Sequence, residues 1–277
     1  MAAIWRYREL LAGLVRKELK VKYKNSGLGF VWSMLNPALY LVVFYVVFVK
    51  ILKAGIPEFP IYLLSGLLVW NLFSTSLAAA TGAVVGNSAI VKKVSFPREI
   101  LALASVGASL VHFFLQALVL LGALAVFRHQ PSATYMALLP VALVALLVFA
   151  AALGVLLAAV NVYARDTEHL LELALLGWFW MTPIVYQYGL VAYGLGDNAW
   201  VYRLNPITPI VLTFQRAIYN RTCCAPLPGG SGPILPTGVG PAWYLGHLAV
   251  VGAVSAVLLL VALRVFGRLE GNFAEEL

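Results

Sequence analysis

Side chains that could carry out acid-base, nucleophilic or metal chemistry are few in this chain and far apart. An enzyme needs a nucleophile, a base or a metal held by several side chains, and no paired His/Asp motif appears. The chain also lacks a Gly-x-x-x-x-Gly-Lys-Ser/Thr phosphate loop and contains no Gly-Lys pair. We therefore expect no catalytic or metal site, and if the protein works with ATP, another chain must bind the nucleotide. The four histidines are His112, His129, His169 and His247.

Two cysteines, Cys223 and Cys224, are adjacent in the sequence. Adjacent cysteines suit neither a metal cage nor an easily formed mutual disulfide. An intermolecular or long-range bridge is the alternative, but the sequence offers no visible partner. We expect two small residues in an external loop.

The charged side chains are separated by six long stretches that contain no Asp, Glu, Lys or Arg. Each is long enough to cross a bilayer, because ~20 apolar residues at ~1.5 Å per residue cross ~30 Å of hydrocarbon. Hydrophobic residues make up 62% of the chain and charged residues 11%, against ~25% charged in an ordinary soluble domain. The stretches cover residues 25–49, 59–91, 100–127, 129–164, 173–196 and 222–263.

We predict an all-α polytopic membrane protein that forms a single transmembrane domain over residues 1–277. Backbone polar groups in lipid must be satisfied within the segment, and the apolar runs lack the strict alternation of a β-barrel. An amphipathic interfacial helix is expected within residues 1–29, a re-entrant external segment at 205–220 and a cytoplasmic tail at 267–277. The six transmembrane helices are expected at about 30–49, 61–85, 100–127, 137–162, 170–186 and 243–266.

The distribution of Lys and Arg predicts the orientation in the membrane. Thirteen lie in the N-terminal segment, in the connections after spans two and four, and at the C-terminal end, while six lie on the other side. We therefore expect a multi-pass protein of the plasma (inner) membrane with both termini in the cytoplasm. This placement accounts for the net charge of +8 without a nucleic-acid partner.

Charge-free spans argue against a transporter driven by an ion gradient, which normally needs ionisable groups at membrane depth. Each carboxylate lies at the end of a span or in a loop. His112 lies inside a span, but that span offers no carboxylate for a proton relay. We expect His112 to make a structural hydrogen bond.

Two compact cytoplasmic connections, Gly86 to Glu99 and Arg165 to His169, are suited to docking a partner. The first contains a short apolar and basic segment. This segment is too short to cross the membrane and more apolar than an ordinary solvent-exposed loop. A rigid protein that receives force through short surface elements would have such connections. The alternative is that both are ordinary loops of the positive-inside type.

Five groups of residues, in order along the chain, resemble the membrane subunits of ATP-binding-cassette exporters of the polysaccharide and polyol-phosphate type. The first leads into span one, and the others lie in span two, in the connections after spans two and four, and in span five. The groups are Lys22 to Trp32 followed by Asn36-Pro37; Tyr62 to Asn71; Asn87 with Phe96 to Ile100; Asn161 to Asp166; and Pro183 to Tyr186.

This resemblance implies a six-span subunit that works as a homodimer with two ATPase subunits and exports a lipid-linked glycan. The ATPase subunits would bind ATP and Mg, so no cofactor is expected in this chain. The N-terminal amphipathic helix would act as a cytoplasmic gate. The gate residues implied are Trp5, Tyr7, Leu11, Arg16, Lys17 and Lys20.

In the same family, the connection between spans two and three inserts into the ATPase. Arg165 and Asp166 would make a second cytoplasmic contact or a structural ion pair. The family often has an aromatic or basic residue just before this Arg-Asp pair, whereas this chain has Ala164, which leaves the contact of the second connection open. The coupling residues implied for the first connection are Ile90, Lys92, Lys93, Phe96, Arg98 and Glu99.

Aromatic side chains are the candidates for a translocation path, because sugars offer C–H faces that stack on rings. Residues spaced by four lie on one side of a helix in span one, and others concentrate in the outer half of span five. Spans one and five could face each other across a dimer. The alternative is the ordinary interfacial belt of Trp and Tyr. The candidates are Tyr40, Phe44, Phe48, Trp178, Trp180, Tyr186 and Tyr188.

The leading hypothesis is a permease that exports a lipid-linked polysaccharide, with cell-wall galactan, O-antigen and teichoic acid precursors as candidate cargoes. A second hypothesis is an exporter of small hydrophobic compounds with the same fold. The third is a membrane-embedded glycan-modifying enzyme, which would require a catalytic cluster that the sequence does not provide.

Overall fold

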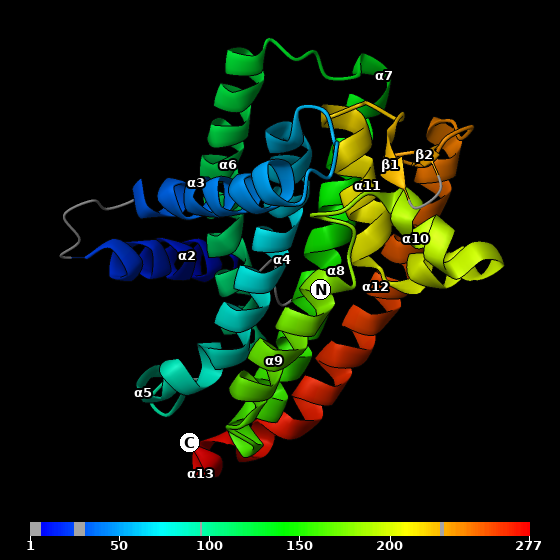
Figure 1. Ribbon diagram of the computed structural model, residues 1–277. Coiled ribbons are helices and arrows are strands. Elements are labelled where there is room, and N and C mark those ends of the chain that lie inside the picture. Colours follow the sequence, from blue (N-terminus) through cyan, green and yellow to red (C-terminus); the bar gives the residue numbers. More distant parts are fainter. Residues whose placement is uncertain (1–6, 25–30, 95, 228–229) are drawn as a thin grey trace.

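The fold is built around four long helices that run alongside one another (Figure 1). They are α4 (Phe59–Gly86), α6 (Glu99–Phe127), α8 (Leu139–Tyr163) and α12 (Pro241–Leu269). Among the described residues, these four helices, α8 together with the turn before it, are long and apolar enough to cross a membrane. They coincide with the spans predicted second, third, fourth and sixth. The computed structural model describes residues 7–24, 31–94, 96–227 and 230–277.

Short elements mark the two ends of this bundle. At one end lie α5, the start of α9, and α13, and at the other lies α7 (Figure 1); we call them the α5 end and the α7 end. The α5 end collects the C-terminal ends of α4, α8 and α12 and the N-terminal end of α6. The short elements are α5 (Ser88–Val91), α7 (Ala133–Met136), η3 (Glu270–Asn272) and α13 (Phe273–Glu276).

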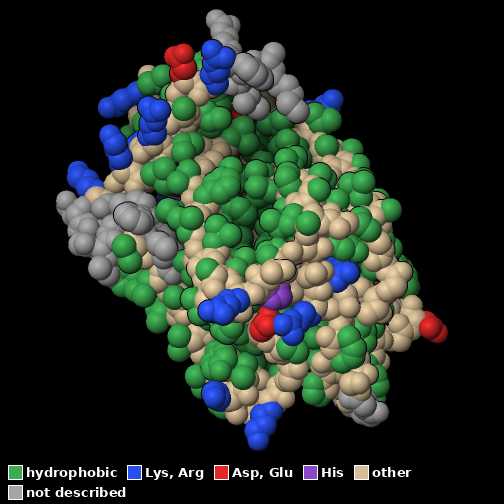
Figure 2. Space-filling view, turned by 90° about the horizontal axis from the view of Figure 1, so that it is seen from above, with side chains coloured by type: hydrophobic (Ala, Val, Ile, Leu, Met, Phe, Trp, Pro, Cys, Tyr) green, Lys and Arg blue, Asp and Glu red, His purple; other side chains and the backbone are tan. Residues whose placement is uncertain are grey.

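The centre of the bundle is α4. In its most apolar 18-residue window 72% of the residues are buried, against 22% in α6 and in α12. The outward faces of α6 and α12 expose large apolar side chains, among them Leu118, Leu121, Val254 and Val257. Hydrocarbon can cover such faces at no cost, whereas water could not. Seen from the α7 end, hydrophobic side chains cover much of the surface and charged side chains gather in small groups (Figure 2).

Small residues let α4 and α8 approach each other closely. A Cβ atom placed on Gly154 of α8 would lie 2.8 Å from the Cβ of Ala80 on α4. About two helical turns further along α8, Asn161 Nδ2 donates a hydrogen bond of 3.1 Å to the carbonyl of Thr81. This tight crossing positions the two connections that follow α4 and α8.

Two helices near the N-terminus, α2 (Arg8–Tyr23) and α3 (Val31–Phe44), lie across α6 rather than along it (Figure 1). The chain continues from α3 as a π-helix, η1 (Tyr45–Ile51). The interfacial helix predicted within 1–29 corresponds to α2. The span predicted at 30–49 corresponds to α3 and η1, of which α3 has 14 residues.

The span predicted at 170–186 begins as α9 (Thr167–Trp180), a helix of 14 residues. Helical structure stops before Pro183, which lacks a backbone N–H. The chain nevertheless continues to the level of the start of α4, because Tyr62 Oη donates a 2.6 Å hydrogen bond to the carbonyl of Tyr186.

The chain then doubles back through α10 (Tyr188–Leu195) and η2 (Gly196–Leu204). Asn205 accepts a 2.8 Å hydrogen bond from Trp178 Nε1, so the chain has returned to the level of α9. From there α11 (Ile207–Ile218) runs back to the α7 end, where Ser132 N donates to Ala217 O at 2.9 Å. The segment predicted as re-entrant at 205–220 covers α11, the returning part of this course.

A polar cluster ties three loops together at the α7 end. Glu58 contacts both His129 and Arg221. The ring of His129 stacks on Tyr219 with 6.1 Å between centroids, and Tyr219 Oη donates to Pro57 O at 2.7 Å. The loops before α4, after α6 and after α11 are therefore held in one arrangement.

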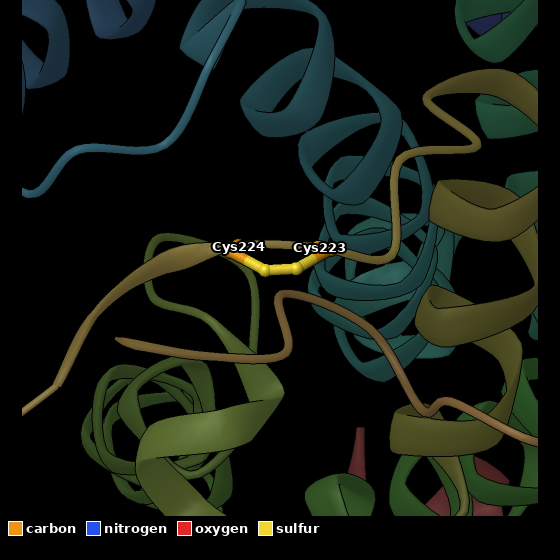
Figure 3. Close-up of a disulfide and its surroundings, with 2 residues drawn as sticks. All are labelled: Cys223 and Cys224. Carbon is orange, nitrogen blue, oxygen red and sulfur yellow. A yellow bond between two sulfur atoms is a disulfide. The ribbon is translucent and has the colours of Figure 1, made fainter. Parts of the chain in front are cut away.

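The loop between α11 and α12 differs in two ways from the all-α expectation. It contains an antiparallel pair of short strands, β1 (Ala225–Leu227) and β2 (Gly230–Gly232). In addition, Cys223 and Cys224 form a disulfide with each other (Figure 3). Our expectation that adjacent cysteines do not easily form a mutual disulfide was wrong, because in this loop the two sulfur atoms face each other. Gly and Pro in this loop interrupt helix and favour such turns.

Candidate functional site

The first connection at the α5 end presents a basic surface. Val91 anchors α5 because its side chain is 2% exposed, while Lys92 and Lys93 directly after it are exposed. Ile90, Phe96, Arg98 and Glu99 are partly buried. The two lysines are thus the members of the predicted coupling set that are most accessible to a partner.

Asn87 connects this first connection to α2. Its Nδ2 donates a 2.8 Å hydrogen bond to the carbonyl of Ala83, which satisfies one of the last carbonyls of α4. Its Oδ1 accepts a 2.6 Å hydrogen bond from Lys17 Nζ. A displacement of α5 would therefore reach α2 through one side chain.

The predicted gate residues lie on two faces of α2. Tyr7 and Leu11 pack beside the buried Leu14 against the apolar core, whereas Arg16, Lys17 and Lys20 are exposed. Ser105 of α6 donates a 2.8 Å hydrogen bond to Glu18 Oε1. Trp5 lies outside the described residues. The helix is attached to α6 and to the end of α4.

The second connection is short, and the buried side-chain amide of Asn161 holds it in place. Asn161, 1% exposed, donates to Glu168 Oε1 at 2.7 Å as well as to Thr81 O. Arg165 and Asp166 are exposed, and within the described part of the chain the structure shows no ion pair between them. The side chains of Arg165 and Asp166 are therefore open to a partner.

The structure brings both connections to one end of the bundle but not into one cluster. The first projects beyond the end of α4, and the second closes the gap between α8 and α9 (Figure 1). Arg98 is bound to the C-terminal segment: its guanidinium donates to the carbonyl of Glu270 and lies 5.9 Å from the centre of the Phe273 ring.

An aromatic groove of about 460 Å³ lies between α3, α4 and α9. Tyr40 and Phe44 stack with 6.1 Å between ring centroids, and Phe44 stacks on Phe179 at the same distance. The rings of Tyr40, Phe44 and Phe179 thus stack in a row along the groove, and amide, hydroxyl and carboxylate groups lie beside them. The lining includes Tyr40, Phe44, Trp70, Phe179, Trp180, Asn71, Ser74, Thr75 and Glu172.

The remaining aromatic residues of the predicted path lie elsewhere. Phe48 stacks on Phe59 with 5.8 Å between centroids. Trp178 packs edge to face on Phe73, at 5.1 Å, within the core. Tyr186 donates to Trp180 O at 2.7 Å, and Tyr188 packs against the core cluster. Of the seven predicted residues, Tyr40, Phe44 and Trp180 line the groove.

Among the described residues, no group of three His, Cys, Asp or Glu side chains could hold a metal ion. His112 is buried on α6, with 6% of its surface exposed.

Residues 9–219, which make up most of this chain, match the ABC-2 type transporter family. This chain belongs to the ABC-2 type transporter family. The matched region begins in α2 and ends directly after α11, so it includes both connections and the aromatic groove.

Some relatives of this ABC-2 transporter chain match it over nearly its full length, and others match only part of it. An O-antigen export system permease protein, RfbA of Myxococcus xanthus, is 32% identical over 274 residues, which cover 99% of this chain and 97% of the relative. An RfbA of Klebsiella pneumoniae is 27% identical over 267 residues, covering 96% and 94%. The polysialic acid transport protein KpsM of Escherichia coli is 28% identical over 79 residues, covering 28% and 31%.

Sequence reasoning missed several residues that the ABC-2 transporter fold brings into the groove. Trp70, Asn71, Ser74 and Thr75 form one face of α4 opposite α3 and α9. Their spacing of three and four residues is a helical face that could have been recognised. Asn87 was noted as part of a motif, but its link to Lys17 depends on how α2 packs.

Replacing Asn87 with Ala should loosen α2 in this ABC-2 transporter. The substitution removes the acceptor for Lys17 and the donor to Ala83 O, and such a hydrogen bond contributes about 1 kcal/mol. Limited trypsin digestion of the purified chain should cleave α2 faster. Asn87→Asp retains an acceptor for Lys17 and should be cleaved more slowly than Asn87→Ala. Equal cleavage of Asn87→Ala and the unmodified chain would contradict the link.

Proposed function

We propose that this chain is the permease subunit of an exporter that moves a lipid-linked polysaccharide outward across the plasma membrane. The observation that carries this proposal is the match over nearly the whole chain to a permease named for O-antigen export. The groove between α3, α4 and α9 supports it, because rings beside neutral polar groups suit the C–H faces and hydroxyls of sugars. Galactan, O-antigen and teichoic acid precursors are the candidate cargoes.

We further propose six membrane crossings, of which the segment from α9 to Tyr186 is one. The remaining one would require α3–η1 to turn from its position across α6 and run along the bundle. The 14 residues of α9 rise by about 21 Å, and the non-helical residues up to Tyr186 extend the segment further toward the start of α4. The hydrogen bond between Tyr62 and Tyr186 O supports a crossing, since it joins the far end of this segment to the first turn of α4. The re-entrant segment would then be α11.

The α5 end is proposed to face the cytoplasm, together with both chain termini. Lys92, Lys93 and Arg165 lie in its two connections, and Arg264 and Arg268 lie in the last turns of α12. This bias in basic residues is the signal that retains a segment in the cytoplasm. α2 belongs to the same side because Lys17 bonds Asn87.

Export is proposed to depend on a homodimer of this chain and two separate ATPase subunits that bind ATP and Mg. Because the sequence contains no phosphate loop, ATP would have to be bound and hydrolysed by another subunit. The outward face of α9 exposes Leu173 and Leu176 by 68% and 63%, and a second copy could cover it. ATPase closure would press on α5 and on residues 164–166, and Asn87 would carry the movement to the gate helix α2.

Depletion of this chain in its own cell tests the proposed function. We expect a lipid-linked polymer to accumulate in the cytoplasmic leaflet, with its composition unchanged, and the unmodified gene to restore its surface display. An exporter of small hydrophobic compounds would instead leave the polymer at the cell surface. A glycan-modifying enzyme would change the composition of the polymer and not its location. Either of these results would contradict the proposal.

A further inference from the structure

Residues 270–277, which follow α12, bury an aromatic side chain at the α5 end. The Phe273 side chain is 0% exposed. It packs edge to face on Phe266 of α12, with 5.3 Å between ring centroids, and on Tyr163 of α8, with 5.9 Å. A short segment at the end of a helix does not bury a ring in this way unless neighbouring elements hold it.

Side chains from both connections hold this segment. From the first connection, Arg98 donates to the carbonyl of Glu270 and lies over the Phe273 ring, 5.9 Å from its centre. Just before the second, Tyr163, the last residue of α8, donates a 2.8 Å hydrogen bond from its Oη to the carbonyl of Leu269. Leu269 is the last residue of α12, and the carbonyl of Glu270 also accepts a hydrogen bond from the Phe273 N–H. Arg98 and Tyr163 thus bind adjacent carbonyls at one helix end.

We propose that residues 270–277 form a clasp that joins the two connections into one docking surface for the ATPase, with Phe273 as its anchor. This inference rests on the proposed function. It gives Arg98 a positioning role, since its guanidinium is engaged by Glu270 and Phe273. Lys92, Lys93, Arg165 and Asp166 remain exposed and form the surface that the partner would contact.

The physical reason for a clasp is the small size of both connections. α5 has four residues, and the second connection is a turn between α8 and α9. Each contact that is mobile before docking must be ordered on docking, which weakens the complex. A segment that fixes both connections in advance removes this cost.

Hydrogen-deuterium exchange on the permease without an ATPase tests the clasp directly. Phe273→Ala and Tyr163→Phe should raise exchange at residues 86–99 and 164–169 together, for Phe273→Ala by about tenfold, which corresponds to about 1.4 kcal/mol. Phe273→Leu keeps an apolar side chain and should have a smaller effect. Glu276→Ala, at an exposed position of the same segment, is the matched control and should change neither connection. Faster exchange confined to residues 270–277 would overturn the proposal.

A double-mutant cycle then tests the role of Arg98 in docking. Arg98→Ala and Phe273→Ala should each weaken binding of the ATPase that co-purifies with the unmodified chain, by about tenfold, and the double variant should be no weaker than either. Fully additive losses would show that Arg98 contacts the ATPase by itself and would overturn its positioning role. If no ATPase binds the unmodified chain, the proposed function fails, whereas the exchange experiment still decides whether the clasp exists.

Discussion

Reversing the charges of Lys92 and Lys93 should abolish export while the permease remains folded. Both side chains are exposed directly after the anchored α5, in the proposed docking surface. Lys92→Glu with Lys93→Glu replaces attraction to an acidic partner surface with repulsion, and mismatched charges across an interface cost several kcal/mol. We expect ATPase co-purification and surface display of the glycan to fall by about two orders of magnitude.

Lys50→Glu with Lys53→Glu is the matched control for this reversal. These two lysines are also exposed, but Lys50 lies in the last turn of η1 and Lys53 in the loop before α4, toward the other end of the bundle. The same change in net charge should leave ATPase binding and export intact. Equal losses in both double variants would show that net charge, and not the docking surface after α5, controls export.

Replacing Gly154 with Leu should prevent the chain from reaching its folded state in usable amounts. A Cβ at this position would already lie 2.8 Å from Ala80 Cβ, so the larger side chain must push α4 and α8 apart. Overpacking of this kind costs about 1–3 kcal/mol and more where the backbone cannot shift. The measurement is the yield of monodisperse protein and its midpoint of thermal inactivation in detergent.

Gly122→Leu provides the control, because nothing lies within 4 Å of a Cβ placed on Gly122 of α6. The same gain in volume on an exposed helix face should leave the yield and the midpoint close to those of the unmodified chain. If Gly154→Leu is as stable as Gly122→Leu, the close crossing of α4 and α8 is not what holds the bundle together.

The fold class and the family followed from local features of the sequence. Long charge-free runs predict helices that cross lipid because hydrocarbon excludes unpaired backbone groups and charges. Four of these runs coincide with α4, α6, α8 and α12. The motifs that led to the family lie in the region that the ABC-2 type transporter family matches, and that prediction is confirmed.

For the candidate sites, the sequence predicted which charged side chains would be exposed, but not which side chains would contact each other. Lys92, Lys93, Arg165 and Asp166 lie between apolar runs and are exposed in the structure. The aromatic residues predicted to line a path do not all lie together in the structure. The spacing of Tyr40 and Phe44 placed both on one face, but Trp178 packs on Phe73 in the core. A helical period fixes which residues share a face and not which neighbour that face meets.

The sequence by itself determined that this chain is a helical membrane protein of the ABC-2 type transporter family, with its charges placed between apolar segments. Composition and periodicity are enough for this prediction, because apolar segments partition into lipid and charged segments stay in water. Only the tertiary structure decided that Asn87 bonds Lys17, that Arg98 turns to Phe273 and that Trp70 joins Tyr40 in one groove. These contacts join residues far apart in the chain, so their partners depend on how whole helices cross.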